Sequence, residues 1–326
     1  MLENNNNKVL CIDRLYSLEY YDNFKNHSLE HVLKNINFAA GSGEIWSFLG
    51  SSVFEVKLLL EIMANSRAFE EGKILINGSD ITGRVGIVLP QIFYIGSTNM
   101  AFGNMNVLEY LMFITSSARR RTVLRQEYLL DFLLRVGLEY ICLTPIVRLT
   151  VEEKTLLLLT AALQSQSQLI IMNLPRLQYS QTEIEVINNL GSVIRQQKKS
   201  LILSTQYSEL AQAVSTHICY IDKGSIIFSG ALGYFLDKYD KVIYILSMED
   251  ANATAVYDIL TLVLPEFKYF ISINRVYVID DKGIKNAYSK LLSTLNSYGI
   301  KPDLIRKNKK NINSALQELL RVHDIQ

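Results

Sequence analysis

Apolar and polar positions along the chain form short apolar runs separated by longer stretches with helical spacing. The short runs have the length and the β-branched content of strands, and they lie at 9–16, 36–40, 44–49, 73–76, 85–89, 169–172, 201–204 and 218–222. Helical spacing marks 56–65, 106–168, 181–198 and 208–215. Strands and helices that alternate in this way predict an α/β layer structure with a largely parallel sheet.

Near residue 240 the pattern changes. Strands are predicted at 242–246, 269–273, 276–279 and 304–307, with helices at 251–260, 284–297 and 312–320. The order strand–helix–strand–strand–helix–strand, followed by one extra helix, is the split βαβ pattern. We therefore expect two domains, 1–240 and a small α+β domain at 241–326.

The composition argues against several classes of function. The 326 residues carry 33 Lys and Arg against 32 Asp and Glu, a net charge of +1, without the basic excess of a nucleic-acid binder. The three cysteines and four histidines form no cluster, so no metal site is expected. The polar N-terminus does not read as a signal peptide, and the longest apolar run, 156–163, is too short to cross a bilayer. With 16 glycines, the chain has few residues for phosphate-binding loops.

One strand-to-helix turn has the setting of a phosphate-binding P-loop. Gly50 follows the apolar run 44–49, at the first glycine position of the pattern GxxxxGK[ST]. Glu55 stands at the second glycine position, Val56 at the lysine position and Lys57 at the hydroxyl position. Lys57 comes one residue late, which on a helix turns it about 100° away from the phosphate side. Alone, the match is more typical of an ordinary turn.

The order of further segments resembles the ATP-binding cassette of ABC transporters. The resemblance covers roughly residues 8–235 and rests on the segments 31–50, 86–91, 148–175 and 201–230. It implies a P-loop NTPase-like cassette, with a mixed sheet core and a helical subdomain at about 92–168. The C-terminal module is similar to the one appended to exporter-type cassettes that drive drug, lipid or polysaccharide transporters.

The resemblance also assigns positions to the family's motifs. Gln91 takes the Q-loop position, Asn173 that of the magnesium-binding Asp, Leu174 that of the catalytic base and Gln206 that of the switch His. The signature positions hold Leu149, Thr150, Val151, Glu152 and Glu153, and Tyr20 or Tyr21 is the candidate for stacking on adenine. Leu174 cannot accept a proton, and the two signature carboxylates would face a polyanion.

Structural interpretations remain open beside these roles. Thr150 and Glu153 together fit a capping box at a helix start, where acidic side chains suit the helix dipole. Gln91 is also typical of a surface loop, Asn173 of an ordinary strand end, and Tyr20 and Tyr21 of packing positions.

These departures lead to the expectation of a degenerate cassette, a pseudo-ATPase without enzymatic activity. No cofactor is expected, with ATP and magnesium bound only weakly or at a partner. The expected partners are a competent cassette, as a heterodimer, and membrane subunits that dock on Ile92–Phe113, which would place the chain on the cytoplasmic face of the plasma membrane. The alternatives are a weak ATPase that uses Lys57, Glu55 or Glu153, and a soluble scaffold or regulator outside transport.

Overall fold

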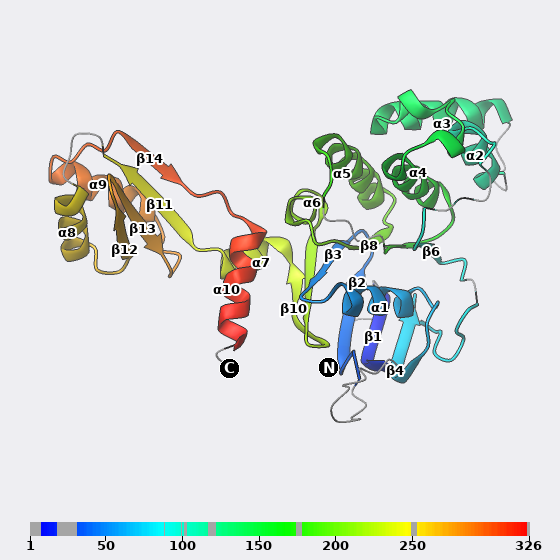
Figure 1. Ribbon diagram of the computed structural model, residues 1–326, viewed down its shortest axis with the longest axis horizontal. Coiled ribbons are helices and arrows are strands. Elements are labelled where there is room, and N and C mark those ends of the chain that lie inside the picture. The colour runs from blue at the N-terminus through cyan, green and yellow to red at the C-terminus, as the bar shows by residue number, and fades with distance from the viewer. Residues whose placement is uncertain are drawn as a thin grey trace. The chain divides into compact units, whose positions relative to one another are not determined.

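The computed structural model describes residues 8–17, 31–87, 89–98, 100, 103–116, 122–173, 178–248 and 253–324 (Figure 1). The chain forms two compact units, Met1–Leu232 and Gly233–Gln326. Nearly all of helix α7 (Leu232–Tyr239), which the sequence analysis placed in the first domain, therefore belongs to the second unit.

A six-stranded sheet forms the centre of the first unit, in the order β10-β9-β3-β8-β7-β6. Its strands are β3 (Ile45–Gly50), β6 (Ile92–Ile95), β7 (Leu169–Met172), β8 (Ser200–Ser204), β9 (His217–Asp222) and β10 (Ser225–Ala231). All neighbouring strands are parallel except the hairpin β9–β10. Every residue of β7 and β8 is buried, as expected for parallel strands covered on both faces.

One face of this sheet packs against helix α1 (Val53–Met63) and a second, antiparallel sheet, in the order β2-β1-β4-β5. The strands of the second sheet are β1 (Lys8–Ser17), β2 (Ile36–Gly41), β4 (Phe69–Ile76) and β5 (Ser79–Asp80). Phe38 lies edge-on to both Trp46 and Phe48, with ring centroids 4.8 and 5.0 Å apart, and joins the two sheets. On this side, the first unit thus combines a largely parallel sheet and an antiparallel sheet around one shared core.

Helices cover the opposite face and build a second core. They are α2 (Val107–Ile114), α3 (Thr122–Val136), α4 (Val151–Gln164), α5 (Gln181–Gln196) and α6 (Ser208–Val214), with the short helices η2 (Glu139–Ile141) and η3 (Ile146–Arg148). The start of α4 confirms the predicted capping box, since Thr150 and Glu153 each accept a hydrogen bond from the other's backbone N–H. At the other end of α4, the Lys199 ammonium donates to the carbonyls of Ala162, Leu163 and Ser165, at 3.0, 3.0 and 2.7 Å.

The second unit confirms the split βαβ pattern. Its elements after α7 are β11 (Val242–Ser247), α8 (Ala253–Val263), β12 (Lys268–Ser272), β13 (Arg275–Asp280), α9 (Ala287–Ser297), β14 (Leu304–Lys307) and α10 (Ile312–Asp324). The sheet order is β12-β13-β11-β14 and every pair is antiparallel. Helices α8 and α9 share one buried core with the sheet, in which Leu260 and Leu291 join Val276 and Val278.

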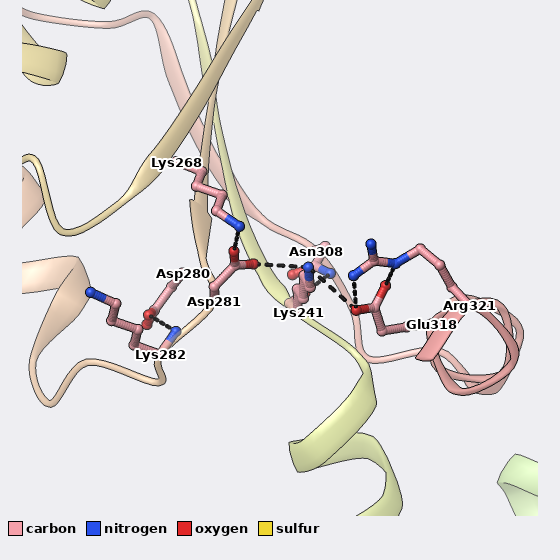
Figure 2. A network of polar contacts seen from close by, with 8 residues as sticks. All are labelled: Lys241, Lys268, Asp280, Asp281, Lys282, Asn308, Glu318 and Arg321. Atoms are coloured by element: carbon pink, nitrogen blue, oxygen red, sulfur yellow. Dashed lines mark hydrogen bonds and ion pairs between the residues drawn. The ribbon is translucent and has the colours of Figure 1, made fainter. Parts of the chain in front are cut away.

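A chain of ion pairs crosses one end of this sheet (Figure 2). Asp281, which follows β13, pairs with Lys268 at 2.5 Å and with Lys241 at 3.1 Å. Lys241 also lies 3.6 Å from Glu318 of α10, and Glu318 is in turn held by Arg321. The network therefore fastens α10 to the sheet.

The strand expected at 85–89 does not form among its described residues 85–87 and 89, so that prediction is wrong. Gly83 and Gly86 have φ values of +77° and +79°, which bend the chain in turns. The Asn65 amide donates to the carbonyls of Arg84 and Ile87 and holds the segment against the end of α1. The strand that joins the sheet is β6, so the helical region begins after Ile95 rather than at Ile92.

In the described parts of the chain, no helix combines the length and the apolar composition that a membrane span needs.

Candidate functional site

The carboxyl ends of the parallel strands β3, β8, β7 and β6 lie at one edge of the central sheet. Ligands of open α/β sheets bind at this kind of edge. It carries Gly50 at the end of β3, Asn173 after β7 and Gln206 beyond β8. The structure therefore brings three of the positions expected from the sequence to one edge, which is the candidate functional site.

The strand-to-helix turn at Gly50 is tightly packed. A Cβ atom on Gly50 would lie 2.9 Å from the Ile221 carbonyl oxygen and 2.9 Å from a Val56 methyl carbon. Glycine is required here by packing alone, whether or not a phosphate ever approaches. Ser52 caps α1 by accepting a hydrogen bond from the Glu55 N–H at 3.5 Å. One backbone N–H of the first turn is therefore already hydrogen-bonded within the chain.

Glu55, at the second glycine position, is bound within the protein. Its carboxylate accepts a hydrogen bond from the Gly224 N–H at 3.1 Å, in the turn between β9 and β10. Burial raises the pKa of the Glu55 carboxyl above its ordinary value, and the Gly224 hydrogen bond opposes that rise. Glu55 thus links the start of α1 to the β9–β10 turn.

The hollow at this edge is small, and no Lys or Arg occurs in the described part of its lining. Among the described residues, it is lined by Phe48, Gly50, Val53, Val56, Ser204, Thr205 and Gln206. The free space is about 10 Å³, room for about one water molecule. Val56, at the lysine position, is buried, whereas Lys57 lies on the exposed side of α1, 3.9 Å from Glu61. Lys57 is not among the described residues that line the hollow.

Asn173 is a buried junction between three elements. Its amide nitrogen donates to the Lys57 carbonyl at 3.1 Å and to the Tyr94 hydroxyl at 3.2 Å. Its amide oxygen accepts from the Ser204 hydroxyl at 3.3 Å. An aspartate at this position could not donate to the Lys57 carbonyl, so the local contacts explain the neutral amide. Tyr94 and Ser204 were not identified from the sequence, because only the fold shows which side chains meet Asn173.

Gln91 is not brought to this edge. It precedes β6, and its carbonyl accepts hydrogen bonds from Gln168 and Leu169 at the opposite end of β7. The residues that follow β6 at the site edge are Gly96 and Ser97. The error came from the wrong strand at 85–89, because counting from β6 would have pointed to Ser97.

The signature positions lie at the start of α4. Leu149 is buried, Val151 is 52% exposed, and Thr150 and Glu153 are engaged in the capping box. Among the described residues around the hollow, none comes from Leu149–Glu153, Glu152 included. Tyr20, Tyr21 and Leu174 lie outside the described residues.

A groove of about 640 Å³ lies beside the edge. Its described lining is Glu61, Ser66, Arg67, Phe93, Tyr94, Gly96, Ser97 and Leu158. Tyr94 belongs to both features, since its ring lines the groove and its hydroxyl contacts Asn173.

No family model matches the chain. It is 24% identical over 159 residues, 49% of this chain and 71% of the relative, to the cytochrome c biogenesis ATP-binding export protein CcmA of Reclinomonas americana. It is 25% identical over 209 residues, 62% of this chain and 57% of the relative, to the sulfate/thiosulfate import ATP-binding protein CysA of Neisseria meningitidis. It is 22% identical over 253 residues, 73% of this chain and 94% of the relative, to the phosphonates import ATP-binding protein PhnC of Lactiplantibacillus plantarum.

Solved structures show the same fold. CbiO1 of Clostridium perfringens, part of an ABC transporter complex, aligns with a TM-score of 0.57 at 15% identity over 79% of this chain and 96% of that chain. A dimeric ATP-binding cassette in a post-hydrolysis state, bound to ADP and Pi, aligns with a TM-score of 0.54 at 16% identity over 68% and 98%. The chain has the ATP-binding cassette fold, and its sequence is similar to ATP-binding subunits of ABC transporters.

These comparisons contradict the expectation that the chain is not an enzyme. All three relatives are named as ATP-binding proteins of import or export systems, and one structure of this fold was solved after hydrolysis with both products bound. The departures at motif positions do not outweigh that similarity, so the pseudo-ATPase interpretation is corrected. The names include both import and export, and the exporter type expected from the sequence is not distinguished by them.

Proposed function

We propose that this chain is an ATP-binding subunit of an ABC transporter that pairs with a second, different cassette and couples it to membrane subunits. The observation that carries the proposal is the cassette fold, with Gly50, Asn173 and Gln206 placed at one edge. The relatives support it, since each is named for ATP binding in a transport or export system. Export is the proposed direction, because the sequence of the C-terminal module resembles the one appended to exporter-type cassettes.

Nucleotide handling by this subunit is proposed to be weak and slow. The hollow at the edge has room for about one water molecule, so a triphosphate requires the turn at Val53 and Val56 to open. No lysine faces the phosphate position among the described lining residues, and charge stabilisation there is usually a large part of the rate. The second cassette is proposed to supply the faster site.

The membrane subunits are proposed to dock beside the edge, within the part of Ile92–Phe113 that follows β6. Gly96 and Ser97 of this part line the groove of about 640 Å³, together with Phe93 and Tyr94 of β6 and the ion pair between Glu61 and Arg67. Aromatic and arginine side chains are enriched where proteins bind partners. The proposed place of the subunit is the cytoplasmic face of the membrane, held by those partners.

The proposal is tested by expressing the tagged chain in its own cells and purifying it in mild detergent. Recovery of a multi-span membrane protein and a second cassette in fixed proportion supports it. ATP turnover is then compared between the lone chain and the complex, and we expect the complex to be faster by at least about tenfold. A chain that stays alone in detergent, or that turns over ATP as fast alone as in the complex, contradicts it.

A paired variant separates the nucleotide site from folding. Val56→Lys combined with Lys57→Ser places a cation and a hydroxyl at the P-loop positions, and we expect tighter binding of Mg-ATP by the lone chain in a thermal-shift titration. Glu71→Lys with Lys73→Ser, on strand β4, likewise introduces one lysine and replaces another by serine, but away from the edge, and should leave nucleotide binding unchanged. Equal effects of both variants contradict the assignment of the edge.

A further inference from the structure

In the described part of the second unit, one face of the sheet lies outside the core that the sheet forms with α8 and α9. Register places three rows of side chains on this face, because residues paired directly across strands point the same way. The rows are Lys268–Ile279–Ile243, Phe270–Tyr277–Ile245–Arg306, and Ser272–Arg275–Ser247–Leu304. We call these residues the open face.

The open face is distinct from the core of the unit. The alternate residues Tyr244, Leu246, Val276 and Val278 are buried in the cluster formed with α8 and α9. No residue of the open face belongs to that described cluster, and all of them are exposed or half-buried. Phe270 is 49% exposed and stacks on Tyr277, with ring centroids 4.2 Å apart and ring planes 15° apart. An apolar, aromatic surface therefore crosses the middle of the sheet.

Charge on the open face has one sign. Lys268, Arg275 and Arg306 contribute cations, and none of its positions in the three rows is an Asp or Glu. Lys268 is neutralised by Asp281 in the network of Figure 2. For Arg275 and Arg306, the described residues provide no ion pair, whereas Lys241, Lys290, Lys310 and Arg321 of the same unit each pair with a carboxylate.

We propose that the open face binds a polypeptide segment of a partner protein that carries apolar anchors flanked by carboxylates. Aromatic and arginine side chains are the residues that most often dominate binding energy at protein interfaces. Complementary charge fixes the register of such contacts and excludes partners of like charge. The carboxylates would meet Arg275 and Arg306, and the anchors would pack on Phe270, Tyr277 and Ile245.

Two other occupants fit the same surface less well. A second copy would set Arg275 and Arg306 against the same two arginines, with no Asp or Glu in the rows of either open face. A single-stranded nucleic acid needs free ring faces for its bases, yet Phe270 and Tyr277 stack on each other and the other two positions of their row are Ile245 and Arg306. The net charge of +1 also lacks the basic excess of a nucleic-acid binder.

The test uses the full chain and fluorescence polarisation with three probes. They are a short peptide of alternating Glu and Leu or Phe, the same peptide with Lys in place of Glu, and single-stranded oligothymidylate. We expect the acidic peptide alone to bind. Arg275→Glu with Arg306→Glu should weaken it at least about tenfold and transfer binding to the basic peptide.

Controls keep the result interpretable. Lys282→Glu with Lys285→Glu reverses two exposed cations outside the open face and should leave the acidic peptide bound as in the wild type. Tyr277→Ser should weaken the peptide without lowering the melting temperature of the chain by more than a few degrees. The proposal is overturned if no probe binds, if oligothymidylate binds best, or if the control variant loses as much affinity as the arginine variant. It is also overturned if the chain self-associates and Tyr277→Ser abolishes that association, because a second copy would then be the occupant. No nucleotide or membrane partner enters this assay, so its failure leaves the transporter proposal standing.

Discussion

The candidate site edge and the open face differ in where their polar groups are directed. At the edge, Glu55 is bound to the Gly224 N–H and Asn173 to groups of α1, β6 and β8. On the open face, Arg275 and Arg306 have no carboxylate partner among the described residues. Residues at positions that resemble a ligand site can therefore be hydrogen-bonded within the protein. A surface that matches no sequence motif can instead present charged groups that are available for binding.

This difference predicts that substitutions in the two regions will affect stability differently. Substitutions at groups bound within the protein should lower stability, because partners are left buried and unsatisfied. Substitutions on the open face should change binding and leave stability almost unchanged.

The largest effect is expected at Asn173. Asn173→Leu removes hydrogen bonds to the Lys57 carbonyl, the Tyr94 hydroxyl and the Ser204 hydroxyl, and should lower the free energy of unfolding by about 3 kcal/mol. Urea denaturation measures it. Asn189→Leu on the exposed side of α5 is the matched control, with a change within about 0.5 kcal/mol. A loss at Asn173 no larger than the control's would show that the junction does not hold in solution.

The next effect is expected at Lys199. Lys199→Met removes the ammonium that donates to three carbonyls at the end of α4, and should cost about 2 kcal/mol at neutral pH. The neighbouring exposed Lys198→Met is its control.

The same residue predicts a pH dependence. Burial lowers the pKa of Lys199 to about 8 in the folded state, below its value in the unfolded chain. Above about pH 8 the unfolded state holds more protons than the folded one, so stability of the wild type relative to Lys199→Met rises as pH increases. Parallel stability curves for the two proteins between neutral and alkaline pH would contradict this.

A smaller effect is expected at Glu55. Burial raises the pKa of Glu55 in the folded state, because the ionised form is disfavoured there. The contribution of Glu55 to stability therefore falls as pH rises through its pKa in the folded state. Glu55→Gln retains an oxygen for the Gly224 N–H and should raise the free energy of unfolding at neutral pH by at most about 1 kcal/mol, with the gain vanishing in acid. Glu71→Gln, exposed on β4, should show neither change.

The smallest effect on stability is expected on the open face. Arg275→Ala and Arg306→Ala remove side chains for which the described residues provide no ion pair, so each should stay within about 0.5 kcal/mol of the wild type in urea. A loss of more than about 1 kcal/mol would place these arginines among the internally bound groups and remove the contrast.

Elements with strong local patterns could be predicted from the sequence. The βαββαβ order and the capping box at Thr150 follow from alternation and from residue chemistry within one turn, and both are confirmed. Two apolar runs separated by Pro90 and Gln91 could not be told apart locally, because either could form the strand next to β7. Pairing of β6 with β7 decided between them, and the turns at Gly83 and Gly86 excluded the first.

The sequence also predicted only part of the candidate site, because one of the strands leading to it was assigned wrongly. Gly50, Asn173 and Gln206 follow strands that were assigned correctly, so they reach the edge. Gln91 was assigned after a strand that does not form, and it lies at the other end of the sheet. The partners of Glu55 and Asn173 are far away in the chain, and no local pattern records such contacts.

The Asn173 amide has a mechanical consequence. A single planar group holds the backbone of α1, the ring of Tyr94 in the groove and the end of β8. Two of these contacts use the amide nitrogen and the third uses the amide oxygen. A displacement of Tyr94 from within the groove would therefore be transmitted through Asn173 to α1 at Lys57.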